Sequence, residues 1–518
     1  MGVPGLWEVI QPVGQSRSLM NIAVVDGFER NTSGRRAYRV GIDTSIWFTH
    51  SYYSKGGENP QLRLLFFRLA KLAELPLLPL FVFDGRERPK VKRGSRMGKS
   101  GSHGLTDAFK QMLGHFGFEW RVAYGEAEAE LARLNQIGII DAILTDDVDT
   151  FIFGARVVIK NWSKELSGNK SKPATDADGK VSKHHVMVFN ADDIRTHPSI
   201  GLTRGGLILF ALLKGGDYDV GVPGIGEKIA HGLARAGFGD QLLTAFERRA
   251  QQPIQPFLAQ WRADITTELR TNSRGLLPHR CTSVTIPVSF PDLQVLENYA
   301  APRISPQGGG PLRDRSSLHV PRIARFCEDS FEWGYRSKIL YRLRSVLWEA
   351  CVMRVLRRAA LEADEKEKTR RIAAGGEPGQ AIRGALTPAR EDTERRRAAF
   401  PGSSGLAAAQ NTARAAPVPT VPKDDPLLVE IVSTRQHAST DRLLEYHVVL
   451  KPGPLVALAN SGITGKRPEP SDAQKGKEHE VDPLGETRMW VPAPMMRQVH
   501  PDLVEDYETS LREKGNKR

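Results

Sequence analysis

Cysteine and long hydrophobic runs are scarce in this sequence of 518 residues. Its three cysteines, Cys281, Cys327 and Cys351, lie far apart and show no zinc-binding spacing, so neither a disulfide framework nor a zinc module is predicted. The most apolar stretch, LPLLPLFVF at 75–83, is shorter than the ~18 residues of a membrane-spanning helix. The first residues, MGVPGLWEVI, lack the basic and apolar segments of a secretory signal. We therefore expect an intracellular protein in a reducing compartment.

Positive charge, by contrast, is in excess. The chain has 73 lysines and arginines against 60 aspartates and glutamates, which gives a formal net charge of +13. This balance suits a polyanionic partner such as nucleic acid, although basic proteins also bind membranes. Hydrophobic residues make up 40% of the sequence, which is enough for a substantial core, and the length predicts about two to four domains.

Three short apolar segments in the first half of the chain each end in acidic residues, and helical patterns lie between them. This alternation predicts an α/β fold with a parallel sheet flanked by helices. Ligands of such folds bind outside the carboxyl ends of the strands, so the acids there should gather at one edge. The predicted strands are 38–43, 80–84 and 141–147, with acids Asp43, Asp84, Asp146 and Asp147, and the predicted helices are 62–74, 106–116 and 126–137.

The stretch GEAEAELARL at 125–134 places Glu126, Glu128 and Glu130 together with no positive charge between them. Two unit charges ~6 Å apart repel by roughly 3 kcal/mol at an effective dielectric of ~20. Mg²⁺ would offset this repulsion, because it takes carboxylate oxygens as ligands, and a pair of such ions can promote phosphodiester cleavage by water. Residues i and i+2 of a helix point ~200° apart. Glu126 and Glu128 therefore converge only if Glu126 precedes the regular helix, and Glu130 is expected to face solvent.

The chain resembles the flap-endonuclease, or xeroderma-pigmentosum-group-G, nuclease superfamily over roughly residues 1–360. Six ordered blocks carry the resemblance: MGVPGLWEVI, GIDTSIWF, FVFDGRERP, YGEAEAELARL, TDDVDTFIFGA and GGDYDVGVPGIGEKIA. It implies a PIN-like α/β core that cuts branched DNA with two Mg²⁺ ions per site, for which Mn²⁺ should substitute. The metal ligands and catalytic carboxylates that it implies are Asp43, Asp84, Glu126, Glu128, Asp147, Asp149 and Asp217. Asp146 is instead expected to be a surface residue at the end of a strand.

The segment RERPKVKRGSRMGK at 86–99 is strongly basic and directly follows Asp84. A charge run of this kind is usually a solvated face, but beside a metal site it would meet phosphates. The resemblance makes it the start of an arch in which Lys92 matches the family's catalytic-side lysine, and Arg96 or Lys99 could supply a second charge. The predicted DNA contacts here are Arg86, Arg88, Lys90, Lys92, Arg93 and Arg96.

The segment VPGIGEK at 222–228 sets three turn-forming residues before a helix. It can be a plain turn, or it can expose backbone N–H groups to a phosphate at the helix N-terminus. The resemblance implies the second role, as a helix–two-turn–helix that grips duplex DNA with a K⁺ ion. Its candidate residues are Gly224, Gly226 and Lys228.

Two further features are candidates for DNA contact. The aromatic residues of SIWFTHSYY at 45–53 belong either to the core or to a surface that stacks on bases at a branch point, and the candidates are Trp47, Tyr52 and Tyr53. The resemblance also places the amino terminus, at Gly2, near the active site. We therefore expect an N-terminally extended protein to be less active.

We expect the chain to divide into a nuclease core, a linker and a C-terminal module. An Ala/Gly/Pro-rich, charged segment predicts the linker. The apolar patterns LLVEIVSTR, LLEYHVVL and MWVPAPM that follow predict a small β-rich module that resembles a chromodomain and is closed by a helix near 500–512. The expected boundaries are 1–205 for the N-terminal and internal PIN-like core, 206–363 for the helix–two-turn–helix and the C-terminal part of the nuclease core, 364–423 for the linker and 424–512 for the module. A long helix is expected at 322–358 within the second of these.

The arch and the module indicate which branch of the superfamily the chain resembles. Asp84 and Glu126 are only 42 residues apart. Flap endonucleases have a longer insertion here, which forms a cap through which a free 5′ end threads, and this chain has too few residues to form it readily. A short Gly/Ser-rich arch leaves room for a second duplex. The resemblance therefore implies a nuclear Holliday-junction resolvase that acts as a homodimer and cuts the junction by paired symmetrical nicks.

Three alternatives remain at this point. The first is a monomeric endonuclease for 5′ flaps and replication forks. The second is a catalytically silent scaffold that binds branched DNA, although the complete set of carboxylates argues against it. The third is a PIN-type ribonuclease, which the helix–two-turn–helix disfavours.

Overall fold

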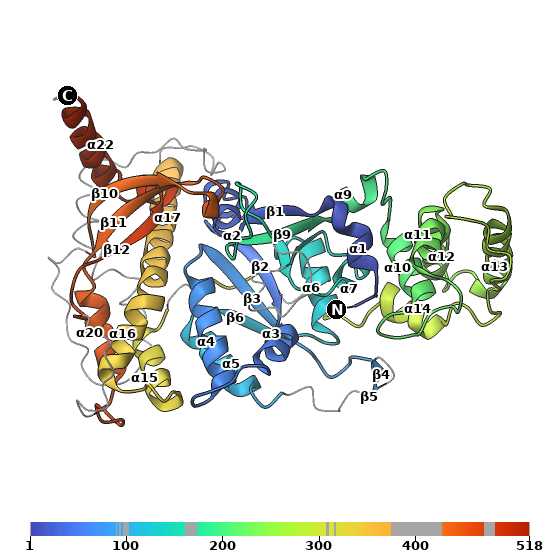
Figure 1. Cartoon of the computed structure of the whole chain (residues 1–518), viewed down its shortest axis with the longest axis horizontal. Helices are drawn as coiled ribbons and strands as arrows, with labels where there is room; N and C mark the ends of the chain where they lie inside the picture. The colour runs from blue at the N-terminus through green and yellow to red at the C-terminus, as the bar shows by residue number, and fades with distance from the viewer. Residues whose placement is uncertain are drawn as a thin grey trace.

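The computed structural model describes residues 2–89, 91–92, 95–96, 103–160, 174–306, 310–314, 318–373, 427–470 and 482–516. Figure 1 shows three blocks in a row, with a central sheet between a helical block and the block that holds the C-terminal strands. Among the described residues, no helix combines the length and the apolar character that crossing a membrane requires.

The central sheet has seven strands among the described residues, in the order β1-β9-β8-β7-β2-β3-β6. The strands are β1 (Gln15–Ser18), β2 (Tyr38–Asp43), β3 (Leu77–Phe83), β6 (Glu119–Val122), β7 (Ala142–Leu144), β8 (Val157–Lys160) and β9 (His185–Asn190). Pairing is parallel from β8 through β6, whereas β9 and β1 add an antiparallel edge. The predicted α/β class is confirmed, with a mixed rather than an all-parallel sheet.

Helices cover both faces of this sheet, and β3 shows why. Alternate side chains of a strand point to opposite faces, and every residue of β3 is buried. Phe81 packs in a core with α3, α4 and α5, whereas its neighbours Leu80 and Val82 pack in a second core with α6 and α7. These helices are α3 (Thr44–Ser51), α4 (Pro60–Ala73), α5 (Thr106–His115), α6 (Ala127–Gln136) and α7 (Asp149–Ile152).

Short elements complete the central block. Before β2 the chain forms α1 (Leu6–Ile10), α2 (Leu19–Asn21) and the π-helix η2 (Ile22–Glu29), and after β9 it forms α9 (Ala191–Thr196). A two-stranded pair, β4 (Val91–Lys92) and β5 (Ser95–Arg96), lies within the predicted arch and is set off from the sheet in Figure 1.

The helical block after the sheet follows the expected pattern of helices around a glycine-rich turn. It contains α10 (Arg204–Lys214), α11 (Glu227–Arg235), α12 (Phe238–Glu247), α13 (Ile254–Thr271) and α14 (Leu293–Ala300). The buried side chains of α10, such as Leu209 and Phe210, join the same core as α6 and α7. This contact fixes the helical block against the edge of the sheet where the acids gather.

The prediction of one long helix at 322–358 is wrong, because this segment forms parts of three helices. They are α15 (Val320–Ser330), α16 (Arg336–Val346) and α17 (Trp348–Ala373). The first break buries Phe331 and Trp333 against Phe66 of α4, and at Gly334 any side chain would meet the Cys327 carbonyl oxygen at 2.7 Å. Residues 364–373 of the expected linker are helical, since α17 continues to Ala373 with an i,i+4 ion pair between Glu367 and Arg371. The rest of that segment, 374–426, lies outside the described residues.

The C-terminal module has a three-stranded antiparallel sheet in the order β10-β11-β12. Two of the predicted strands match the structure, but the one predicted at 489–495 ends at Pro492 and is followed by a helix. A further helix, α20, lies between β11 and β12. The elements are β10 (Leu428–Gln436), η3 (Ala438–Thr440), β11 (Leu444–Leu450), α20 (Gly453–Gly462), β12 (Thr487–Pro492), α21 (Ala493–Val499) and α22 (Pro501–Asn516).

The module docks on the nuclease core through a buried carboxylate. Glu328 of α15 is 1% exposed and accepts backbone hydrogen bonds from Thr464 (2.9 Å), Gly465 (2.6 Å) and Lys466 (2.9 Å), plus one from the Thr464 hydroxyl (2.7 Å). These hydrogen bonds hold the pKa of Glu328 below its usual value although burial acts to raise it. Glu328 is therefore a buried anchor for the loop after α20, which also pairs with the core at its surface through Lys466 and Asp329.

We predict that Glu328→Ala loosens this docking, because it leaves several buried N–H donors unpaired at a cost of ~1–3 kcal/mol each. The variant should lose at least about 2 kcal/mol of unfolding free energy in urea, and amide exchange should accelerate at 463–467. Asp329→Ala is the matched control, since Asp329 pairs with Lys466 of the same loop at 2.6 Å but is exposed. Equal stability of the two variants would contradict the prediction.

Candidate active site

Carboxylates converge where β2, β3 and β7 end. Asp43 is buried at the end of β2 and caps α3, with Oδ1 accepting from the Ser45 amide (2.8 Å) and Oδ2 from the Ser45 hydroxyl (2.8 Å). Asp84 follows β3, and its Oδ1 accepts from the backbone amide of Ala127 at the start of α6 (2.9 Å). The edge predicted from the strand pattern is thus the place where the acids meet.

Glu126 and Glu128 converge in the way that helical geometry requires. Glu126 is the N-cap of α6 in extended conformation (φ −82°, ψ 140°), and Glu128 lies in the first helical turn. Both carboxylates contact the ammonium of Lys92, whose Nζ is 3.0 Å from Glu126 Oε1 and 3.5 Å from Glu128 Oε2. Lys92 therefore reaches from the arch into the cluster.

Glu130 does not face solvent as expected. It is 4% exposed, and its Oε2 accepts a hydrogen bond from the Ser305 amide at 2.8 Å. Residues 301–306, which we call the strap, cross over the start of α6 and cover it. Gly125 permits the crossing, because a Cβ there would lie 2.4 Å from the Arg303 carbonyl oxygen. The residues around Glu130 in the sequence do not indicate that Ser305, 175 positions away, packs against it.

Asp147 and Asp149 meet the amino-terminal segment. Asp149 Oδ1 accepts from the Val3 amide at 2.9 Å, and Asp147 Oδ1 accepts from the Asp149 amide at 3.0 Å. Gly2 has φ +81°, and a Cβ there would lie 2.3 Å from Oδ1 of both aspartates. Asp146, which we expected at the surface, is partly buried beside this pair, and its carbonyl oxygen accepts from the Trp7 indole (3.0 Å).

We predict that Gly2→Ala weakens divalent-ion binding, because the new methyl group must displace Asp147 or Asp149 and the backbone there is left-handed. The Mn²⁺ affinity measured by electron paramagnetic resonance should fall by ~10-fold or more, about 1.4 kcal/mol. Gly34→Ala is the control, since Gly34 also has positive φ (+68°) but has nothing within 4 Å of a Cβ. Unchanged Mn²⁺ affinity in the Gly2 variant would refute the prediction.

Asp217 completes the cluster from the segment after α10, and Tyr218 beside it is a residue that sequence reasoning missed. Asp217 Oδ2 is 2.9 Å from Lys92 Nζ. The Tyr218 hydroxyl donates to Glu126 Oε2, and its ring packs against Tyr299 with the centroids 4.7 Å apart. The sequence feature that could have indicated Tyr218 is its position in GGDYD, next to the predicted ligand Asp217. Tyr218 holds Glu126 toward the other acids.

Burial makes the ionised form of these carboxylates unfavourable unless cations neutralise their charge. Burial, reinforced by Asp84 and Asp147, raises the pKa of Asp43 to about 7. Burial and neighbouring carboxylates also raise the pKa values of Glu128 and Asp149 well above their usual range. Burial opposes the charge on Lys92, yet Glu128 and Glu126 hold its pKa well above its usual value. A single ammonium cannot neutralise all of these acids.

The residues fit divalent cations. All the candidate ligands offer carboxylate oxygens, which Mg²⁺ and Mn²⁺ prefer, and Asp147 Oδ2 is a buried oxygen with no hydrogen-bond partner. As the side chains stand, no three His, Cys, Asp or Glu groups of the described residues are arranged to hold one ion. The Lys92 ammonium lies instead among Glu126, Glu128 and Asp217.

The remaining candidates in the arch and the aromatic segment divide into exposed and buried side chains. Arg86 is exposed, and Arg88 pairs with Asp84 at 3.4 Å. Tyr52 and Tyr53 are 71% and 76% exposed and available to stack on bases, whereas Trp47 is 2% exposed. The prediction for Trp47 is therefore wrong, because its ring is packed between Phe81 and the Arg68 guanidinium. Predicted contacts outside the described atoms are Lys90, Arg93 and the side chain of Arg96.

The glycine-rich turn leads directly into the N-terminus of α11. Gly224 has φ +84°, and Gly226 is the N-cap of α11 with nothing within 4 Å of a Cβ. Lys228 is exposed in the first turn of α11. Backbone N–H groups at this helix N-terminus are open to an anion.

Two family models match the chain. The XPG I-region matches residues 117–217, and the Holliday junction resolvase Gen1 C-terminal domain matches residues 427–510. The human protein named Flap endonuclease GEN homolog 1 is 33% identical over 271 residues, which cover 48% of this chain and 26% of the human protein. The chain thus spans only a minor part of the length of that relative.

Solved structures match over nearly the whole chain. The Holliday junction-resolving enzyme GEN1, in complex with product DNA and Mg²⁺, superposes with a TM-score of 0.66 at 28% identity, covering 99% of this chain and 100% of the other. The eukaryotic junction-resolving enzyme GEN-1 with potassium gives a TM-score of 0.67 at 28% identity and the same coverage.

Proposed function

Because this chain belongs to the xeroderma-pigmentosum-group-G nuclease superfamily, in its Holliday-junction-resolving branch, we propose that it resolves four-way DNA junctions. It is then a structure-selective endonuclease that hydrolyses phosphodiester bonds by paired, symmetrical nicks. One observation carries the proposal: acids from separate strands and helices gather at one largely buried edge of the sheet. They are Asp43, Asp84, Glu126, Glu128, Asp147, Asp149 and Asp217.

These carboxylates would hold two Mg²⁺ ions, with Mn²⁺ as a substitute, and a K⁺ ion would bind at the glycine-rich turn. Two such ions supply an activated water and charge stabilisation at the leaving oxygen. The unpaired Asp147 Oδ2 and the raised pKa values support cation binding here.

The chain's own residues bind and orient the DNA. The Lys92 ammonium, already inside the cluster, steers the scissile phosphate toward the carboxylates. The N–H groups near Gly226 and the Lys228 ammonium grip the backbone of a duplex arm. Tyr52 and Tyr53 offer aromatic faces to the base pairs at the branch point. Tyr218 keeps Glu126 oriented throughout.

Paired nicks require two active sites, so we also propose that two copies of the chain assemble on one junction. The positive net charge of +13 favours DNA binding by each copy. The substrate places the protein in the nucleus, where it would serve DNA repair and recombination.

The test is incubation of the purified protein with labelled four-way junction, 5′ flap and linear RNA, in Mg²⁺ or in EDTA. We expect symmetrical paired nicks in the junction that need Mg²⁺. Cleavage of flaps alone would favour a monomeric flap or fork nuclease. Tight junction binding without Mg²⁺-dependent cuts would favour a silent scaffold, and cleavage of RNA alone would favour a ribonuclease.

A further inference from the structure

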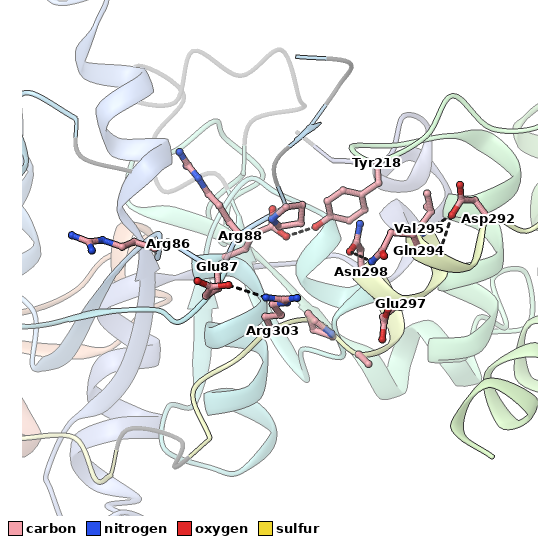
Figure 2. Close-up of a pocket in the computed structure, with 15 residues that line it drawn as sticks. Arg86, Glu87, Arg88, Tyr218, Asp292, Gln294, Val295, Glu297, Asn298 and Arg303 are labelled. Atoms are coloured by element: carbon pink, nitrogen blue, oxygen red, sulfur yellow. Dashed lines mark hydrogen bonds and ion pairs between the residues drawn. The ribbon is translucent and has the colours of Figure 1, made fainter. Parts of the chain in front are cut away.

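A cavity of about 790 Å³ opens beside the carboxylate cluster and has no role in the function proposed above. Glu126 and Tyr218 form part of its lining, so it adjoins the acids directly. In Figure 2 the loop residues Glu87 and Arg88 lie on one side of it and helix α14 on the other, with Tyr218 between them, while Arg86 points away. Its volume lies within the ~300–1,000 Å³ of small-ligand sites.

The α14 side of the cavity presents neutral hydrogen-bonding groups. Gln294 Nε2 donates to Asn298 Oδ1 at 3.3 Å, which leaves the Gln294 oxygen and the Asn298 NH₂ group to act as an acceptor and a donor. The two acids of this wall are engaged. Asp292 caps α14 by accepting from the amides of Gln294 and Val295, and Glu297 pairs with Arg249 at 3.3 Å.

The opposite wall combines a guanidinium with apolar side chains. Arg303 of the strap pairs with Glu87 at 2.8 Å, and both residues line the cavity. Pro302 and Pro89 add apolar surface to this wall. The strap is fixed by the hydrogen bond from Ser305 to the buried Glu130, so this wall is part of the fold.

The charge of the lining selects against a phosphate. Its four acids, Glu87, Glu126, Asp292 and Glu297, outnumber its three arginines, Arg86, Arg88 and Arg303, so the lining has no excess of positive charge. Duplex backbones are bound by surfaces of uncompensated positive charge. A nucleobase, by contrast, is neutral and flat, stacks on guanidinium and apolar surfaces, and presents donor and acceptor edges that carboxamides recognise.

We propose that this cavity receives an unpaired nucleobase adjacent to the scissile phosphate, and that Gln294 and Asn298 read its edge. The inference rests on the proposed nuclease function, because the cluster must hold the scissile phosphate for the neighbouring base to reach the cavity. It assigns a base preference at the cut site to α14, an element that contributes no carboxylate to the cluster.

The experiment uses the full-length protein and its Gln294→Ala/Asn298→Ala double variant on junctions that carry each of the four bases beside the cut. The wild type should cut the best base about tenfold faster than the worst, and the double variant should cut all four at nearly equal rates. Gln260→Ala is the matched control, since Gln260 also donates to a residue four positions on, Asp264, but lies on α13 outside the cavity.

A binding measurement separates failure of this inference from failure of the proposed function. With Ca²⁺ in place of Mg²⁺, 2-aminopurine at the same position should change its fluorescence on binding to wild type and to Gln260→Ala, and much less with the double variant. A protein that binds but never cuts would overturn the nuclease proposal alone. Equal rates for all bases together with equal fluorescence in all three proteins would overturn the base-reading site alone.

Discussion

Asp43→Asn should reduce Mg²⁺-dependent junction cleavage by at least ~10³-fold, a rise of about 4 kcal/mol in the activation barrier. Asparagine keeps the volume of the side chain and an oxygen that can accept from the Ser45 amide, so the cap of α3 survives. It removes one of the buried negative charges that the cations need. Single-turnover cleavage of a labelled four-way junction measures the effect.

The same substitution should stabilise the fold in EDTA. Burial raises the pKa of Asp43 from 3.8 to about 7. At pH values between these two, the Asp43 carboxyl group is therefore more fully protonated in the folded state than in the unfolded chain. Stability attributable to this group therefore falls as the pH rises through that window and stays low above it. The Asp43→Asn variant has no such charge and so does not lose this stability. Its melting temperature should exceed that of the wild type by more at pH 8 than at pH 5.

Asp146→Asn is the matched control for both measurements. Asp146 lies next to Asp147 in the sequence, but it is not among the proposed ligands, so its variant should retain cleavage within a few-fold. An Asp43 variant that cuts within tenfold of wild type would sink the metal-centre assignment. A lower melting temperature at pH 8 in EDTA would instead contradict the account of the buried charge.

Lys92→Ala should produce opposite changes in catalysis and in metal binding. Cleavage should fall by ~10²–10³-fold, because a positioned charge at the scissile phosphate is lost. Divalent-ion affinity should rise, since Lys92 Nζ no longer lies between Glu126 (3.0 Å) and Asp217 (2.9 Å), where it competes with a cation for the same oxygens. Single-turnover rates at saturating Mg²⁺ and Mn²⁺ titration by electron paramagnetic resonance measure the two effects.

Lys110→Ala controls for the loss of a lysine near the arch, because the Lys110 ammonium lies 4.5 Å from the centre of the Trp120 ring. It should leave both readouts close to wild type. If Lys92→Ala weakened Mn²⁺ binding, the lysine would be supporting the ligands rather than competing for them. If its cleavage rate were normal at saturating metal, it would not steer the phosphate.

The acids were predictable because each follows a local rule. Asp43 and Asp84 stand at the ends of apolar strands, and parallel strands bring such ends to one edge. Glu126 and Glu128 converge because one precedes the helix and the other lies in its first turn. Such rules depend on a few neighbouring residues, and so they can be read before the fold is known.

Residues whose surroundings come from distant parts of the chain were misjudged or missed. Glu130 is covered by the strap, Trp47 is enclosed by Phe81 and Arg68, and Tyr218 meets Glu126 from 92 positions away. The segment 322–358 carries helical patterns throughout, yet Phe331 and Trp333 interrupt it to reach Phe66.

The sequence by itself determined the chemistry of this protein: an excess of positive charge, a mixed α/β order and a set of acids that only cations make tolerable. Tertiary structure alone decided which neighbours those acids have, where Lys92 points, and that α14 and the strap enclose a cavity beside them. The physical reason is range. Strand ends and helix starts are set by short stretches of chain, whereas burial and enclosure depend on segments that meet only when the chain has folded.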